Sequence, residues 1–383
     1  TKNQTLLLRR FLRRRPVLLN IRSMKQEKVI VAMSGGVDSS VSAALLKRAG
    51  FDVTGIFMKC WDASDPFGES CTSTDDERMA RLAAEKIGIP FYSVNFIKEY
   101  KEKVVEYLLD GYRKGITPNP DVMCNKEIKF GLFFEKAMEL GADFVATGHY
   151  ARLRPSINSG LRRGKALIFQ AKDQNKDQSY FLSFIMPEVL ERVMFPIGEY
   201  TKPEVREMAR KFGLPNADRK DSQGICFIGK VDFVGFLKQY IPEKVGKIVD
   251  TKGSVLGEHE GVFYYTIGQR KGIRLSGGPY YVVAKDLKKN LLIISKNESE
   301  VCQKKVRVTG LNWFAEVPTD KPMEVNAQIR YRQKPAPSTL TIDSHGKTCT
   351  LVFKEPQRAV TPGQLAVLYM GQEMIGGGVI QSG

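Results

Sequence analysis

The fold of this chain is decided by one stretch near its N-terminus, Val29-Ile30-Val31-Ala32-Met33-Ser34-Gly35-Gly36-Val37-Asp38-Ser39-Ser40. Its five apolar residues predict a short buried strand, and residues 41 to 49 have helical composition. Between them, two glycines let the backbone approach a phosphate closely, and the helix N-terminus and the serine hydroxyls offer hydrogen-bond donors. The stretch therefore predicts a phosphate-binding turn between a strand and a helix.

The same stretch supplies most of the candidate ATP-binding residues, which are Ala32, Met33, Ser34, Gly35, Gly36, Val37, Asp38 and Ser39. Asp38 is also the candidate magnesium ligand. The pattern differs from a P-loop, because no lysine follows the glycines.

An alternation of strands and helices continues after this turn. The expected elements are strands at Val53–Met58, Phe91–Phe96 and Ala142–Thr147, and a helix at Asp75–Ile87. Such alternation predicts an α/β fold with a doubly wound parallel sheet, whose ligands bind beyond the carboxyl ends of the strands. Met58 and Gly148 lie at such ends and join the nucleotide site, although Met58 suits the core equally well. At His149, also at a strand end, we favour a site position over a structural histidine.

Two of the six cysteines stand in unusual surroundings. A proline-rich segment precedes Cys124. Asn125 is expected to cap a helix that begins at Lys126. The thiol of Cys124 would then lie near a helix N-terminus, which would lower its pKa. Cys226 lies in a polar, glycine-bounded segment that predicts a loop. We therefore expect Cys124 and Cys226 to be reactive. Buried, inert thiols are expected at Cys60, Cys302 and Cys349. Six cysteines are too few for a disulfide framework, so the chain suits a reducing compartment, and the lack of a C-x-x-C pair excludes a zinc ribbon or a thioredoxin-type motif.

The remaining chain predicts further domains. Residues 27–223 form the expected catalytic domain. Residues 224–277 form a small central linker domain, whose stretch Gln269 to Lys271 is expected to contact the phosphates of a nucleic acid. Residues 278–383 contain short alternating runs that predict a C-terminal antiparallel β-barrel. These runs are Tyr280–Val283, Leu291–Ile294, Val325–Tyr331, Thr339–Ile342, Cys349–Phe353 and Gln364–Tyr369. No apolar stretch is long enough to predict a membrane-spanning helix.

Charge indicates a polyanionic partner. The chain carries 59 basic and 42 acidic residues, a net charge of +17. Residues 1–26 contain eight of the basic residues and no acidic one, interleaved with leucines. This composition favours a mitochondrial transit peptide over a disordered basic arm. The alternative is a cytoplasmic form whose translation starts at Met24.

Several segments together resemble known families. The string Ser34 to Ser40 resembles the pyrophosphate loop of the adenine-nucleotide alpha-hydrolase-like superfamily, whose members cleave ATP between the α and β phosphates. Other segments occur in the order seen in tRNA-specific 2-thiouridylases, and the leader makes the chain similar to a mitochondrial form. They are Pro118 to Phe130, Ala146 to Ala151, Asn175 to Leu182, Asp221 to Gly229, Thr266 to Gly272, Arg330 to Gln333 and Thr361 to Gln364.

This resemblance implies an activity. ATP, with magnesium, would adenylate the wobble uridine of tRNAs for Lys, Glu and Gln, and sulfur would replace the oxygen at carbon 2. Cys226 matches the persulfide carrier, supplied by a relay from a cysteine desulfurase. Cys124 matches the nucleophile, and the two would end in a transient disulfide. Asp121 matches a residue that contacts the target base and handles its proton.

The resemblance also implies tRNA contacts at Asn119, Pro120, Asp121, Lys176, Asp177, Gln178, Arg330 and Tyr331. Cys71 has no assigned role. An iron–sulfur cluster on Cys71, Cys124 and Cys226 is an alternative that we do not favour, because the cysteines lack a ligand-like spacing.

Two other functions remain open at this point. Amidotransfer or argininosuccinate-type ligation would keep the pyrophosphate loop and require neither Cys124 nor Cys226. A non-catalytic tRNA-binding protein would bind tRNA without consuming ATP.

Overall fold

The computed structural model describes residues 26–61, 73–155, 166–221, 232–317, 321–343 and 345–381. The chain divides into two compact units. Unit 1 comprises Thr1–Tyr100 and Cys124–Lys230, and unit 2 comprises Lys101–Met123 and Val231–Gly383. Residues 101–123 thus group with the C-terminal part of the chain. A division of the chain into consecutive domains, such as the predicted one, does not contain this grouping. The domain boundary at 223/224 stays a prediction, whereas the boundary at 277/278 is too early, because β10 (Tyr281–Asp286) and β11 (Leu291–Ser295) belong to the middle sheet.

Unit 1 is built on a five-stranded parallel sheet of order β3-β2-β1-β4-β7. The strands are β1 (Lys28–Ala32), β2 (Asp52–Lys59), β3 (Phe91–Asn95), β4 (Phe144–Ala146) and β7 (Val193–Met194). β1 lies between β2 and β4, so the strand order reverses there, and the crevice beyond such a switch point is where α/β sheets bind ligands. The predicted doubly wound sheet is confirmed.

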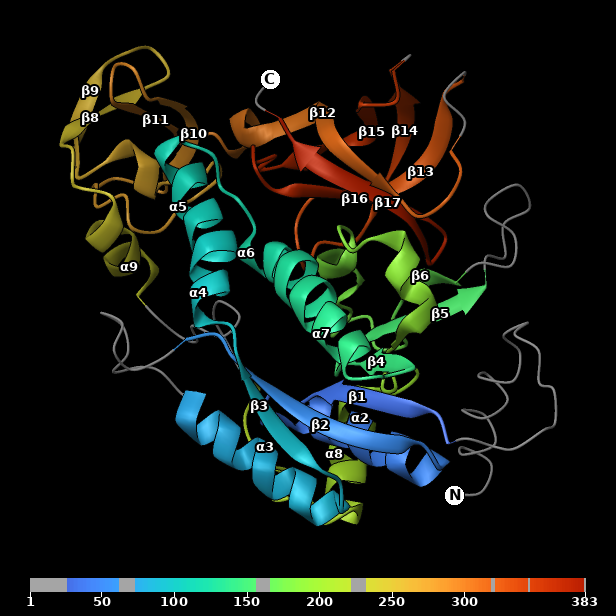
Figure 1. Ribbon diagram of the computed structural model, residues 1–383. Coiled ribbons are helices and arrows are strands. Elements are labelled where there is room, and N and C mark those ends of the chain that lie inside the picture. Colours follow the sequence, from blue (N-terminus) through green and yellow to red (C-terminus); the bar gives the residue numbers. More distant parts are fainter. Residues whose placement is uncertain are drawn as a thin grey trace. The chain divides into compact units, whose positions relative to one another are not determined.

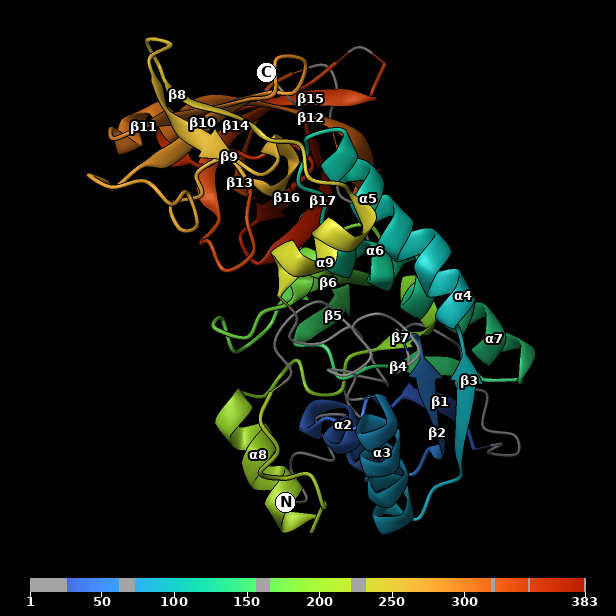
Figure 2. The ribbon, with the colours of Figure 1, turned by 90° about the vertical axis from the view of Figure 1, so that its left-hand side faces the viewer.

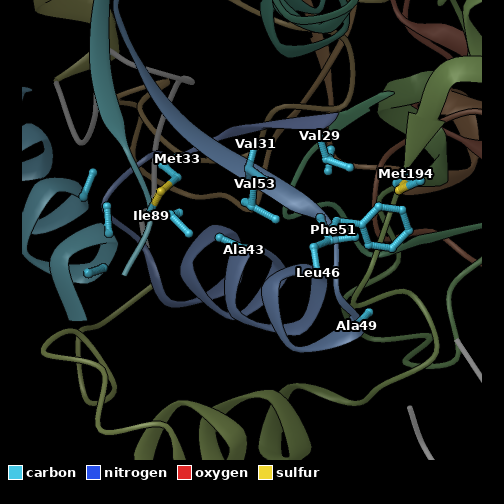
Figure 3. Close-up of a cluster of buried hydrophobic side chains, with 14 of the residues drawn as sticks. Val29, Val31, Met33, Ala43, Leu46, Ala49, Phe51, Val53, Ile89 and Met194 are labelled. Atoms are coloured by element: carbon cyan, nitrogen blue, oxygen red, sulfur yellow. The ribbon is translucent and has the colours of Figure 1, made fainter. Parts of the chain in front are cut away.

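Helices flank this sheet. α2 (Val37–Ala49) and α3 (Ser73–Ile87) cover one face, and α7 (Phe133–Glu139) lies on the other (Figure 1). α8 (Lys202–Lys211) packs beside α2 (Figure 2). The core between the sheet and α2 is apolar on both sides, with Val31 and Val53 facing Ala43 and Leu46 (Figure 3). Full burial of each such valine or leucine contributes about 1.5–3 kcal/mol to stability.

Shorter elements complete the description of both units. In unit 1 they are α4 (Ile97–Tyr100), the π-helical segment η3 (Cys124–Leu132), the hairpin β5 (Ala151–Pro155) and β6 (Ala166–Gln170), and the 3₁₀ turns Ser179–Leu182 and Pro187–Arg192. In unit 2 they are the π-helical segment Lys101–Val105, α5 (Glu106–Arg113), α6 (Pro120–Met123), α9 (Phe233–Tyr240) and the 3₁₀ turns Val262–Tyr264 and Glu298–Val301.

Unit 2 contains a small sheet of order β10-β11-β8-β9, which forms the predicted middle domain. Its strands are β8 (Gly246–Asp250), β9 (Val255–His259), β10 (Tyr281–Asp286) and β11 (Leu291–Ser295). The assignment of Tyr280–Val283 and Leu291–Ile294 to the barrel was therefore wrong. β11 pairs in parallel with β8, and Val282 and Leu292 pack around Ile248. Alternation predicts that a run is a strand, but it does not say which sheet the strand joins.

The second sheet of unit 2 is the predicted antiparallel barrel. Its strands are β12 (Cys302–Trp313), β13 (Met323–Gln328), β14 (Ala336–Ile342), β15 (Thr348–Arg358), β16 (Leu365–Met370) and β17 (Glu373–Ile380). They pair in the order β12-β15-β14-β13-β16-β17, and pairing of β12 with β17 closes the ring. Among the described residues, no helix is long and apolar enough to cross a membrane.

Candidate nucleotide site and cysteine segment

The turn between β1 and α2 has the geometry of a phosphate-binding loop. Gly35 has φ +75°, and a Cβ there would collide with the carbonyl of Asp76 at the start of α3. Only glycine suits such a position. Gly36 is the N-cap of α2 and carries no capping side chain. The amides of the first helical turn have no intrahelical acceptor, so they remain donors for an anion.

Serine hydroxyls hold this turn in shape. Ser39 Oγ accepts a hydrogen bond from Ser34 N at 3.1 Å and donates one to Gly36 O at 3.2 Å. Ser40 Oγ donates to the same carbonyl at 3.0 Å. Ser39 and Ser40 are buried, whereas Ser34 is exposed. Ser34 is thus the serine of this turn whose hydroxyl is best placed to meet a ligand.

Two predicted neighbours of the turn have different surroundings. Gly148, just after β4, lies against the first turn of α2, because a Cβ there would be 2.6 Å from Ser39 N. The predicted convergence of strand ends is thereby confirmed at Gly148. Met58 in β2 is buried, as are Ala32 and Met33, so their side chains belong to the core.

His149 is a buried structural histidine by its contacts. Its Nδ1 lies 2.7 Å from Thr147 Oγ1, and its ring packs between Phe130 and Phe195 at centroid distances of 5.9 and 6.0 Å. Burial, together with the nearby charge of Lys129, lowers the pKa of His149 well below its usual value. The ring is therefore neutral, and the preference for a site position is not supported by these contacts.

Asp38 is the centre of a charged cluster that the sequence does not reveal. Lys202 Nζ lies 2.8 Å from both Asp38 oxygens, and Tyr150 OH donates to Asp38 Oδ1 at 2.8 Å. Burial, together with the Asp38 charge, raises the pKa of Tyr150. Tyr150 is therefore a protonated donor at neutral pH. Lys202 is 164 residues away in sequence, and only the packing of α8 on α2 brings it to the loop.

The same lysine joins a second carboxylate. Lys202 Nζ lies 2.8 Å from Asp221 Oδ1, and Asp221 also pairs with Lys176 at 2.6 Å and Arg206 at 2.8 Å. Although desolvation opposes the shift, the Lys176 and Lys202 ammonium groups hold the pKa of Asp221 at about 2. Asp221 is thus ionised at neutral pH, five residues before Cys226 in the sequence.

Two further residues, Asn216 and Arg219, stabilise the loop and the start of α3 beside it. Asn216 Nδ2 donates to Gly35 O at 2.8 Å and to Ser40 Oγ at 2.9 Å. Arg219 pairs with Asp75 and Asp76 at the start of α3, at 2.9 and 2.7 Å. Neither residue is predicted from the sequence, since neither stands in a pattern that signals the loop.

The segment around Cys124 differs in one respect from the prediction. Asn119 Oδ1 accepts a hydrogen bond from Val122 N at 3.2 Å, so Asn119 caps the short helix α6 that begins at Pro120. The predicted cap at Asn125 was wrong, because helical structure begins before Cys124; Asn125 instead donates to Phe181 O at 3.3 Å. Cys124 opens the π-helical segment η3, and its side chain is fully buried. π-helical segments are rare and frequent at functional sites. Cys71 and Cys226 lie outside the described residues.

The predicted tRNA contacts differ in their exposure and in the hydrogen bonds that they already make. Asp177 and Gln178 already bind within unit 1: Asp177 accepts from Ala171 N at 2.7 Å, and Gln178 accepts from Tyr150 N at 3.0 Å. Burial raises the pKa of Asp177. Arg330, in contrast, is exposed after β13, where basic side chains can reach phosphates. Asn119 is buried, and Pro120, Asp121, Lys176 and Tyr331 are partly exposed.

A metal site made only of protein ligands is not found in the described part of the chain, which contains no cluster of three or more His, Cys, Asp or Glu side chains. Magnesium commonly binds through one or two carboxylates together with substrate phosphates and water. Asp38 at the mouth of the turn fits such a role.

Three family models match the chain in order. They are described as a tRNA methyl transferase HUP domain at residues 27–230, a tRNA methyl transferase PRC-barrel domain at residues 234–296 and an aminomethyltransferase beta-barrel domain at residues 303–380. The first alone covers more than half of the chain.

Curated relatives match along nearly the whole chain. The tRNA-specific 2-thiouridylase MnmA of Levilactobacillus brevis is 48% identical over 365 residues, which cover 93% of this chain and 96% of that protein. The protein of the same name from Streptococcus thermophilus is 48% identical over 361 residues, covering 92% and 95%. A solved 4-thiouridine synthetase–RNA complex with bound ATP aligns over 56% of this chain and 50% of that chain, with 18% identity and a TM-score of 0.33, a likeness too small to support an argument.

Proposed function

The chain belongs to the family of tRNA-specific 2-thiouridylases, and from that premise we propose how its residues divide the reaction among them. The protein is a tRNA 2-thiouridylase, an ATP-using enzyme that replaces the oxygen at carbon 2 of the wobble uridine by sulfur. The proposed reaction has two chemical steps, which are activation of the base by ATP and transfer of sulfur to it.

The first step is activation of the base. The O2 oxygen of the uridine attacks the α phosphate of ATP, the bond to the β phosphate breaks, and pyrophosphate leaves. The backbone from Ala32 to Ser39 and the strand ends at Met58 and Gly148 surround the nucleotide. The observation that carries this assignment is the turn itself, with Gly35 at φ +75° and an N-terminal helical turn that lacks a capping side chain.

Magnesium is the metal that the first step needs. Asp38 would hold it together with phosphate oxygens, and the ion would offset the charge that develops on pyrophosphate. The carboxylate of Asp38 is a ligand type that magnesium prefers, and the hydrogen bond from Tyr150 OH holds Asp38 Oδ1 in place.

The second step is sulfur transfer. The Cys124 thiolate attacks the Cβ-bound sulfur of a Cys226 persulfide, the sulfur–sulfur bond breaks, and hydrosulfide leaves as a Cys124–Cys226 disulfide forms. Hydrosulfide adds to the activated carbon 2, and AMP leaves with the former uridine oxygen. An external thiol reduces the disulfide and restores both thiols. A relay from a cysteine desulfurase supplies the persulfide.

The tRNA contacts are assigned from the family segments. Asp121 contacts the flipped-out target base and handles its proton, beside Asn119 and Pro120. Lys176 to Gln178 and Arg330 with Tyr331 contact the tRNA, and tRNAs for Lys, Glu and Gln are the expected substrates. The exposure of Arg330 supports its part in this assignment.

The cysteine roles are tested by mass spectrometry of tRNA nucleosides. Unmodified tRNAs are incubated with ATP, magnesium, a desulfurase and cysteine. Wild type and Cys302→Ser, a control for cysteine loss in the barrel, should form 2-thiouridine, whereas Cys124→Ser and Cys226→Ser should not. Thiolation by either of the latter two variants would refute its assigned role.

The same mass spectrometry of nucleosides distinguishes thiolation from a second candidate function. The description of two family models as tRNA methyl transferase domains raises methyl transfer as a candidate. Methyl transfer would add a methyl group without exchanging oxygen for sulfur, and it would need neither ATP nor the two cysteines. With a methyl donor added to the incubation, a methylated uridine in place of a thiolated one would support it.

The leader is the remaining proposal. Residues 1–26, basic and free of acidic residues, would direct the protein to mitochondria. A fluorescent protein fused behind residues 1–26 should enter mitochondria, and one fused to a leader with its five arginines between Arg9 and Arg15 replaced by glutamine should stay in the cytosol.

A further inference from the structure

Lys202 is a buried cation that the two proposed reaction steps do not use. It is only 8% exposed, and its ammonium group lies between Asp38 of the pyrophosphate loop and Asp221, 2.8 Å from each. A buried ammonium is costly unless it is paired, and here two carboxylates pair it. The two ion pairs offset the cost of burying the ammonium group, but they do not explain why a lysine is placed beside a phosphate-binding turn.

The position of Lys202 in its helix makes the case stronger. It is the first residue of α8, directly after the N-cap Thr201. A cation at a helix N-terminus is unfavourable for the helix, because the helix dipole is positive there. Helix stability therefore does not account for a lysine at this position.

The pyrophosphate loop itself supplies no positive charge to a bound phosphate. Ser34 to Ser40 contains no basic residue, although pyrophosphate carries several negative charges. P-loop proteins meet this need with a lysine inside the loop. In this protein a lysine next to the loop comes from a distant part of the sequence, because Lys202 at the start of α8 lies against Asp38.

The lysine is also anchored so that its ammonium group alone can move. Its backbone N–H donates to Asp173 Oδ2 at 2.9 Å, and the Thr201–Glu204 capping box fixes the start of α8. A flexible four-carbon side chain extends from this fixed point. If the ammonium group leaves Asp38, Tyr150 OH still donates to that carboxylate.

We propose that Lys202 is the phosphate-binding cation of the ATP site. Without nucleotide it neutralises Asp38 and Asp221; when ATP binds, its ammonium group moves from Asp38 to the β and γ phosphates, and Asp38 becomes available to magnesium. This inference rests on the proposed ATP site.

The test measures binding rather than turnover. Calorimetry compares an ATP analogue with a methylene group between its α and β phosphates, inorganic pyrophosphate and AMP, each with magnesium. Lys202→Met should weaken the analogue and pyrophosphate by about tenfold or more, equivalent to about 1.4 kcal/mol. It should leave AMP unchanged, because AMP lacks the β and γ phosphates.

Matched variants separate binding from folding. Lys172→Met removes a lysine that pairs with Glu204 of the same helix at the surface, and it should bind all three ligands as wild type does. Asp221→Asn removes a competing carboxylate, so it should bind the analogue at least as tightly as wild type. This last variant tests the proposal even if Lys202→Met does not fold.

Two outcomes would overturn the inference. Equal weakening of AMP and the analogue by Lys202→Met, or weakening by Asp221→Asn similar to that by Lys202→Met, would mean that the lysine only holds the site together. Failure of the wild type to bind the analogue would instead refute the ATP site, and the inference with it.

Discussion

Asp221 connects the charge cluster to the pH dependence of stability. Its pKa of about 2 in the folded protein lies below the ordinary value of about 3.9 for an unfolded aspartate. A lowered pKa contributes stability above the unfolded value, and this contribution is lost as the pH falls through the folded value. Asp221 therefore stabilises the protein at neutral pH and ceases to do so near pH 2.

Comparison with Asp221→Asn isolates this contribution. Wild type should unfold at a higher temperature than the variant at pH 5 to 7, and the difference should shrink as the pH falls from about 4 to about 2. Calorimetric unfolding at a series of pH values measures it. A difference that is constant over this range would show that the Asp221 charge is not stabilising.

Gly35 and Gly88 allow a second comparison between single residues. Both have positive φ, +75° and +73°, but a Cβ at Gly35 meets the Asp76 carbonyl, whereas one at Gly88 meets nothing within 4 Å. Gly88→Ala should therefore cost only the conformational penalty, about 1–2 kcal/mol of unfolding free energy.

Gly35→Ala should additionally displace the turn from α3 and abolish binding of the ATP analogue. Urea unfolding and calorimetry of both variants measure the two effects. Normal nucleotide binding by Gly35→Ala would show that the turn tolerates a different backbone path.

Helix α2 connects the core to the site, because its first turn faces the phosphate position and its middle packs against the sheet. Leu46 is 1% exposed in this core. Leu46→Ala should lower the unfolding free energy by about 2–5 kcal/mol, through lost burial and a cavity. Lys47→Ala, exposed on the same helix, should change it by less than about 0.5 kcal/mol. Similar losses in the two variants by urea unfolding would contradict this packing of α2.

The elements that sequence could predict are those with local signals. The strand and turn from Val29 to Ser40 combine apolar run, glycines and helix start, and the structure places them as expected. Lys202 and Asn216 could not be found in this way, because their partners lie 164 to 181 residues away. Tertiary packing decides such contacts. The prediction of the helix cap was wrong for a related reason. Asn119 and Asn125 are both capping residue types, and the π-helical segment Cys124–Leu132, which contains Asn125, has no sequence signature.

Across the whole molecule, the excess of positive charge matches the substrate. The net charge of +17 leaves +9 after residues 1–26 are set aside. In unit 2, Arg330, Arg332 and Lys334 are exposed within five residues, next to Tyr331. Basic residues in such a group can bind RNA phosphates, with release of the counterions that surround them.

Salt dependence of tRNA binding tests this role of the barrel. If Arg330 contacts a phosphate, Arg330→Ala should weaken tRNA binding and reduce the slope of log affinity against log salt concentration by about 1. Lys347→Ala removes the same charge from an exposed turn between β14 and β15, and it should leave the slope unchanged. Filter binding or fluorescence anisotropy with a substrate tRNA, over a range of potassium chloride concentrations, measures both slopes. Because both variants change the net charge equally, a reduced slope only in Arg330→Ala indicates a local phosphate contact. An equal reduction in both would mean that tRNA is attracted by the overall charge of the protein, and that Arg330 has no special part in binding it.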